Sequence, residues 1–154
     1  MNRKIITIRD LALVEKELGS ATAGVVSVSL KKENFAQFAT NFVFQNKNVF
    51  FYLENEELLR TIKLDALAKF TILKDKNFTK ELVDKNDTLY RLFSIVVTGS
   101  IREAEEQKTI KNIAQSFIEK YSGKLLFSDK DNQPGGKLFL IDSEELLAYD
   151  EIGF

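Results

Sequence analysis

Hydrophobic and polar residues alternate over several short segments of the chain, and this period of two is typical of half-buried β-strands. Val26 and Val28 share one face of a strand that begins at Gly24. The first three predicted strands cover residues 24–30, 35–44 and 49–53. Short polar turns separate them, so we expect an antiparallel meander.

Three further strands are predicted in the second half of the chain, at residues 68–73, 92–104 and 138–141. Gly99 indicates a bend or bulge in the long one. Helical spacing predicts helices at residues 11–19, 56–64 and 110–121, the first capped by Asp10. Residues 74–90 and 129–136 are polar and predict loops. Six antiparallel strands with helices between them indicate a closed or nearly closed barrel, formed by a single domain over residues 1–154.

The chain contains no histidine and no cysteine. This composition excludes Ser-His-Asp and Cys-His catalysis, histidine-ligated zinc and disulfides. Carboxylates alone suit harder ions, and the acidic residues lack the spacing of a calcium loop, so we expect no metal site. Any chemistry would then come from a bound cofactor or from carboxylates, lysine, tyrosine and hydroxyl groups, or the protein carries out none.

The charges nearly cancel, with 22 basic and 23 acidic residues, and they form no basic stripe of the kind that binds nucleic acid. No apolar run approaches the length of a membrane span. The apolar stretch within residues 1–10 is too short for a signal peptide. We therefore expect a cytoplasmic protein without nucleic-acid or membrane partners.

The order of these elements resembles the split-barrel flavoproteins related to pyridoxamine 5'-phosphate oxidase. The stretches that carry the resemblance read GVVSV (24–28), ATNFVF (39–44), VFFY (49–52), RTIKL (60–64), AKFTI (68–72) and FSIVVTGSI (93–101). The resemblance extends from about Asp10 to Tyr149 and implies a mainly β (α+β) fold, an antiparallel six-stranded split β-barrel with flanking helices.

Members of that family are dimers that hold flavin mononucleotide (FMN) at the interface, and the resemblance therefore implies an FMN-binding homodimer. Arg60 matches the family's basic phosphate ligand, and Thr61 and Lys63 lie beside it. Thr40 and Asn41 stand where family members contact the flavin ring. The resemblance implies a flavin-dependent oxidoreductase that acts on an unknown small-molecule substrate.

The chain also departs from the family pattern. Leu58 and Leu59, preceded by Glu56 and Glu57, replace residues that often include a serine and a second basic side chain. Acidic residues oppose phosphate binding, so a cofactor-free dimer with a structural or interaction role is an alternative. Haem handling, known among split-barrel relatives, is another. The chain lacks the family's C-terminal Arg-x-His segment, so we do not expect pyridoxamine phosphate oxidation.

Overall fold

The computed structural model describes residues 2–75, 90–121, 127–128, 133–134 and 136–153. Its elements are β1 (Arg3–Ile8), α1 (Leu11–Ser20), β2 (Gly24–Ser29), β3 (Phe35–Thr40), β4 (Val43–Gln45), β5 (Asn48–Leu53), α2 (Glu56–Thr61), β6 (Leu67–Asp75), β7 (Tyr90–Glu103), α4 (Gln107–Tyr121), β8 (Phe127–Ser128), β9 (Gln133–Pro134) and β10 (Lys137–Gly153). All three predicted helices are present, and the Asp10 side chain caps α1 by accepting a hydrogen bond from the Leu13 amide at 3.3 Å. The predicted loop at 74–90 lies mostly outside the described residues.

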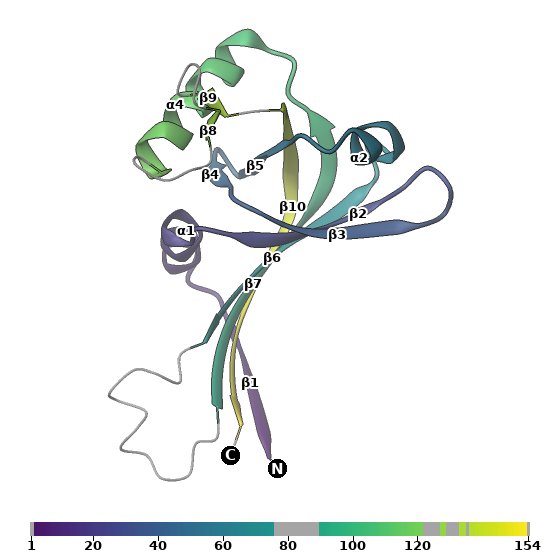
Figure 1. Ribbon diagram of the computed structural model, residues 1–154. Coiled ribbons are helices and arrows are strands. Elements are labelled where there is room, and N and C mark those ends of the chain that lie inside the picture. The colour runs from purple at the N-terminus through teal and green to yellow at the C-terminus, as the bar shows by residue number, and fades with distance from the viewer. Residues whose placement is uncertain (1, 76–89, 122–126, 129–132, 135, 154) are drawn as a thin grey trace.

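One antiparallel sheet dominates the fold and curls into a half-barrel (Figure 1). Its strand order is β3-β2-β6-β7-β10-β5-β4, and β1 pairs with the last third of β10. β8 and β9 form a separate two-stranded ribbon. The prediction of a mainly antiparallel split barrel with flanking helices is therefore confirmed. The sheet has eight strands rather than six, because one predicted strand is divided and β1 is added.

The barrel core lies on the concave face of this sheet. Alternate residues of the central strands point into it, and α1 and the segment after α2 close it with Val14, Leu18 and Ile62. The strand residues that are almost fully buried there include Val26, Phe70, Ile95, Val97, Ile101 and Ile141. The period of two in the sequence therefore predicted the inner face of these strands correctly. Burial of each side chain of this size contributes about 1.5–3 kcal/mol.

The predicted second strand, residues 35–44, is two strands. The alternation breaks at Phe42 and Val43, which are both buried. β3 pairs with β2, whereas β4 pairs with β5 at the other edge of the sheet. Both antiparallel pairings of the predicted meander are therefore present, but its second strand is divided between the two edges of the sheet, so the three strands do not lie side by side. The chain leaves one edge strand at Thr40 and enters the opposite one at Val43, and this crossing brings the two edges of the half-barrel together.

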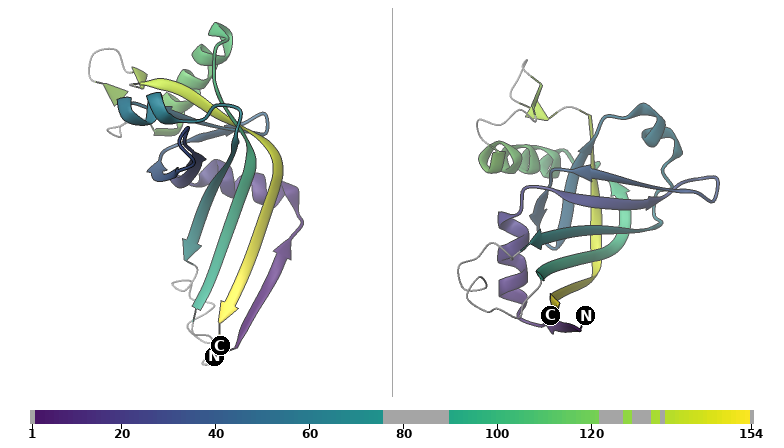
Figure 2. Two further views of the ribbon diagram at one scale, coloured as in Figure 1. Left: turned by 90° about the vertical axis from the view of Figure 1, so that its right-hand side faces the viewer. Right: turned by 60° about the horizontal axis from the view of Figure 1, so that its bottom comes forward.

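The two ends of the chain pair with each other along β10. This strand has 17 residues and pairs with β7, β5 and β1 in turn, whereas the sequence predicted only 138–141. Figure 2 shows β6, β7, β10 and β1 side by side. The sequence did not predict β1, because the adjacent Ile5 and Ile6 break an alternating pattern. Both side chains are exposed, and the segment is a strand because it pairs with β10.

The irregularity predicted at Gly99 lies on the partner strand. The register of β10 against β7 shifts between Ser143 and Glu145, opposite Gly99 and Thr98. A Cβ atom on Gly99 would collide with the carbonyl oxygen of Asp142. Gly99 is therefore needed for the close approach of the two backbones beside the bulge.

Candidate functional site

The short helix α2 carries the predicted phosphate-binding residues. Asn55 starts it, because its side chain accepts a hydrogen bond from the Leu58 amide at 3.1 Å. The Thr61 hydroxyl donates to the Glu57 carbonyl oxygen at 2.7 Å and closes the last turn. The partly buried Leu58 and Leu59 pack against the barrel core, so the opposite side of the helix faces solvent.

The two ends of α2 differ in charge. Glu56 and Glu57 lie in the first turn, where carboxylates suit the positive end of the helix, and Arg60 lies in the last turn. The Asn55 cap and the two acids therefore occupy the end of the helix whose amide groups could otherwise bind a phosphate. An anion beside α2 would depend on side-chain cations alone.

Backbone hydrogen bonds fix the end of α2 against the β2–β3 hairpin. The Lys31 amide donates to the Thr61 carbonyl oxygen at 2.8 Å, and the Lys63 amide donates to the Ser29 carbonyl oxygen at 3.0 Å. Arg60 and Lys63 have exposed side chains, and neither forms an ion pair with another described residue. Arg60, Thr61 and Lys63 thus form a basic segment, held in place by the backbone, at one end of β2.

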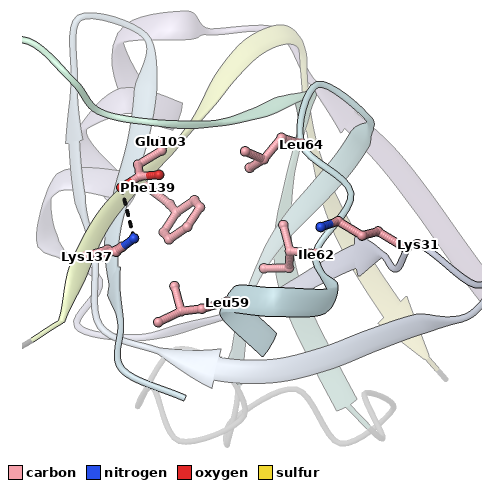
Figure 3. Close-up of a pocket in the computed structure, with 7 residues that line it drawn as sticks. All are labelled: Lys31, Leu59, Ile62, Leu64, Glu103, Lys137 and Phe139. Atoms are coloured by element: carbon pink, nitrogen blue, oxygen red, sulfur yellow. Dashed lines mark ion pairs between the residues drawn. The ribbon is translucent and has the colours of Figure 1, made fainter. Parts of the chain in front are cut away.

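A cavity of about 160 Å³ opens beside this segment, at the mouth of the half-barrel (Figure 3). It is lined by Lys31, Leu59, Ile62, Leu64, Glu103, Lys137 and Phe139. Four of these side chains are apolar and form the floor, and Figure 3 shows Lys31 and Lys137 on opposite sides of it. Mouths of β-barrels are common ligand sites, and an apolar floor with a few charged groups is their usual lining.

The charges at the cavity are only loosely paired. The Lys137 ammonium lies 3.8 Å from a Glu103 carboxylate oxygen, and the two side chains are 60% and 35% exposed. An exposed pair of this kind contributes about 0–1 kcal/mol. Lys31 forms no ion pair within the described part of the chain. The cavity lining therefore carries one positive charge in excess.

Thr40 and Asn41 lie at the other end of β2, because Thr40 pairs with Gly24 whereas Lys63 is bonded to Ser29. Five residues of strand separate the two places, which is about 16 Å at 3.3 Å per residue. The structure does not gather the five predicted residues into one cluster. Only an extended ligand would reach both ends.

The polar groups of Thr40 and Asn41 are engaged within the chain. The Thr40 hydroxyl donates to the Asn41 carbonyl oxygen at 3.0 Å. The Asn41 amide donates to the Thr22 carbonyl oxygen at 2.7 Å. Asn41 therefore holds the crossing between β3 and β4 against the chain segment that follows α1, and its Oδ1 atom is the group left for a ligand.

Residues of α4 complete this crossing. The Tyr121 hydroxyl lies 2.8 Å from the Phe42 carbonyl oxygen and accepts from the Phe42 amide at 3.1 Å. Lys120 donates to the same carbonyl at 3.0 Å and sits 4.0 Å above the centre of the Phe42 ring. Burial lowers the pKa of Lys120 to about 8. These contacts fix α4 against the sheet.

Sequence reasoning missed Lys31, Glu103, Lys137 and Phe139. They come from the turn after β2, the end of β7 and the start of β10, and the fold brings them to the mouth of the barrel. No local pattern marks them, because each looks like an ordinary residue at the end of a strand or in a turn.

Within the described ranges, no group of three or more acidic side chains is arranged to hold a metal ion. No described helix is long and apolar enough to cross a membrane.

No protein-family model matches this sequence, and no curated protein is significantly similar to it. Solved structures are similar over nearly the whole chain. An FAD-binding protein from Mycobacterium smegmatis is 15% identical with a TM-score of 0.67, over 96% of this chain and 100% of that one. A candidate pyridoxamine 5'-phosphate oxidase from Corynebacterium glutamicum is 13% identical with a TM-score of 0.64, over 96% and 98%. A haem storage protein from Vibrio cholerae is 11% identical with a TM-score of 0.65, over 90% and 94%. At such identities the likeness concerns the fold.

Proposed function

We propose that this chain, which shares its fold with flavin-binding and pyridoxamine 5'-phosphate oxidase-like split barrels, is itself a flavin-binding protein and binds FMN. The observation that carries the proposal is the structural likeness to the FAD-binding protein, which covers 96% of this chain. When bound, a flavin supplies two-electron redox chemistry. We therefore infer a flavin-dependent oxidoreductase that acts on a small molecule.

The residues beside α2 fit the phosphate end of FMN. Arg60 can hold a phosphate through two parallel hydrogen bonds, and Lys63 adds a point charge. The Thr61 hydroxyl donates its proton to the backbone carbonyl oxygen of Glu57, but its oxygen can still accept a hydrogen bond. At the ring end, the Thr40 hydroxyl donates to the backbone, and the Asn41 side-chain amide is hydrogen-bonded to Thr22 and Tyr121. The Oδ1 atom of Asn41 is therefore the atom we assign to the flavin there. The fit is better for the phosphate than for the ring.

The first experiment is to titrate the purified protein with FMN and with riboflavin, following the quenching of flavin fluorescence. Arg60→Ala should weaken FMN binding roughly ten- to hundredfold, because a charge-assisted hydrogen bond contributes about 1.5–3 kcal/mol. Riboflavin, which has no phosphate, should bind wild type and variant equally. Arg9→Ala, an exposed arginine outside the site, is the matched control and should leave both affinities unchanged.

Equal FMN affinity in wild type and Arg60→Ala would remove Arg60 from the site. A colourless protein that binds neither FMN nor FAD would overturn the flavin proposal. It would favour the alternative of a cofactor-free split barrel with a structural or interaction role.

Haem is the second candidate, supported by the likeness to the haem storage protein from Vibrio cholerae. This chain offers no histidine and no cysteine to iron. Tyrosine is a remaining common ligand, and burial raises the pKa of two of the four tyrosines, Tyr52 and Tyr121, which disfavours an iron-binding phenolate at those two positions. The absorbance spectrum separates the two candidates, because haem gives a Soret band and a flavin gives two visible bands.

We further propose that the protein is a homodimer. Exposed apolar residues on the convex face of the sheet support this proposal, among them Val25, Leu67 and Leu73, whose exposed fractions are 43%, 55% and 67%. Val25, Thr71, Val96 and Leu147 are paired across four neighbouring strands and form one row of this face. A two-fold partner that covers such a row is the common solution.

A further inference from the structure

We propose that the cavity at the mouth of the half-barrel binds a small monocarboxylate whose apolar part is about the size of one six-membered ring. This ligand site lies beside the segment that carries Arg60 and Lys63, but none of the five flavin residues lines it, and it does not depend on a bound flavin. Three features of the cavity carry the inference, namely its size, its charge and the rigidity of its rim.

The size of the cavity sets the size of the ligand. At about 160 Å³ it is close to the roughly 150 Å³ of an apolar cavity that admits benzene. A single ring or a short branched chain fits in this volume, whereas the three fused rings of a flavin would extend beyond it. The floor suits such a group, because Ile62 and Phe139 are nearly fully buried and Leu59 and Leu64 border them.

The charge of the cavity sets the charge of the ligand. Lys31 and Lys137 outnumber Glu103 by one, so a single negative charge neutralises the lining. The Lys137–Glu103 pair is long and exposed, and a ligand carboxylate can share Lys137 at little cost. A dianionic phosphate would bring a second negative charge beside Glu103. The lining therefore favours a monoanion.

The rim of the cavity is fixed by three backbone hydrogen bonds at two places. Lys31 is held through its amide to Thr61, and the segment that bears Leu64 is held through the Lys63 amide to Ser29. The Ala104 amide donates to the Leu138 carbonyl oxygen at 2.9 Å and fixes the strand ends that carry Glu103 and Phe139. A rim already in place lowers the entropic cost of binding.

The experiment uses the whole protein labelled with ¹⁵N and titrated with benzoate, while amide chemical shifts are recorded. We expect saturable shifts at Leu59, Ile62, Glu103 and Phe139. Benzamide, which has the ring without the charge, and acetate, which has the charge without the ring, should each bind roughly tenfold more weakly or worse. Lys31→Gln should weaken benzoate binding roughly three- to tenfold, as expected for loss of one charged contact.

Glu103→Gln provides the sharpest test, because removal of the competing carboxylate should strengthen benzoate binding. Lys16→Gln, on the exposed side of α1, is the matched control and should change nothing. Leu64→Ser alters the floor at a half-exposed position where folding is not at risk, and it should weaken binding.

Several outcomes would overturn the inference. They are equal affinity for benzoate and benzamide, weaker binding in Glu103→Gln, shifts that spread over the surface without saturation, and the absence of any binding. A repeat in saturating FMN separates the two proposals. Benzoate affinity should persist there, and its loss by direct competition would assign the cavity to the flavin. A protein that binds benzoate but no flavin would instead sustain this inference alone.

Discussion

The convex face of the sheet is covered in one half and bare in the other. Over β4, β5 and the start of β10, α4 packs Ile113, Phe117 and Tyr121 against the strands and forms a second apolar cluster. Over β2, β6 and β7, no described helix covers the face, and Val25 and Leu73 remain exposed. The apolar convex side of one group of strands is thus buried under a helix, whereas that of the other group stays exposed.

This comparison shows which apolar strands are left for a dimer contact. The segment 49–53 is rich in apolar side chains, and by composition alone it could face a partner. Residues 49–51 and Leu53 are buried within the chain itself, between the barrel core and α4. The apolar surface left for a partner lies on the other half of the sheet. An apolar strand face indicates that some other surface packs against it. The fold decides whether that surface belongs to the same chain.

The largest expected effect comes from removing the centre of the covered half. Phe117 is 3% exposed and its ring lies 4.9 Å from that of Tyr52 and 5.7 Å from that of Tyr121. Phe117→Ala should lower the free energy of unfolding by about 3–5 kcal/mol. Urea denaturation followed by circular dichroism measures the change. Leu73→Ala, on the bare half, should change it by less than about 0.5 kcal/mol, and equal losses would contradict the comparison.

Tyr121→Phe tests the hydrogen bonds between Tyr121 and Phe42 that attach α4 to the crossing between β3 and β4. The substitution removes the hydroxyl that accepts from the buried Phe42 amide, while the ring stays in place. Leaving that amide without a partner should cost about 1–3 kcal/mol. The Phe42 carbonyl oxygen keeps its hydrogen bond from Lys120. The rate of hydrogen exchange at the Phe42 amide should rise with the loss of stability. An unchanged rate there would argue against a stabilising role for the hydrogen bond to Tyr121.

Lys120 should give the covered half a pH dependence. Burial lowers its pKa from 10.5 to about 8 in the folded chain. Between these values the unfolded chain binds more protons, so the free energy of unfolding should rise with pH. Above pH 10, Tyr52 and Tyr121 act in the opposite sense, because burial raises their pKa values. Stability is therefore best compared at about pH 8 and about pH 9.5.

Lys120→Met should remove this rise, whereas Lys16→Met, on the exposed side of α1, should retain it. A rise of equal size in both variants would place its origin elsewhere.

The smallest effect on the fold itself is expected on the bare half, where the consequence is association. Val25→Glu combined with Leu73→Glu should leave the circular dichroism spectrum unchanged and convert the proposed dimer to a monomer. Sedimentation at tens of micromolar, roughly above the dissociation constants of stable dimers, measures this. Leu13→Glu, on an exposed position of α1, is the control and should remain dimeric. A wild-type monomer would overturn the dimer proposal.

The basic segment at Arg60, Thr61 and Lys63 was predictable because it is contiguous in the chain, and the structure leaves Arg60 and Lys63 exposed for a ligand. The family resemblance placed Asn41 at the flavin ring, but within the chain its side-chain amide donates to the Thr22 carbonyl oxygen. The cavity could not be predicted. Its residues are spread from Lys31 to Phe139, and only the curl of the sheet brings them together.

The sequence by itself determined the helices and the inner faces of the central strands, because caps and burial periodicity act over a few residues. Only the tertiary structure decided the division of residues 35–44, the full length of β10 and the existence of β1. For β1 and β10 the deciding contact joins segments far apart in the chain, such as Arg3 with Gly153. At the division of residues 35–44, the distant contact is that of Phe42 with Tyr121. A strand at an edge acquires its conformation from its partner, since its own side chains bury too little surface to impose one.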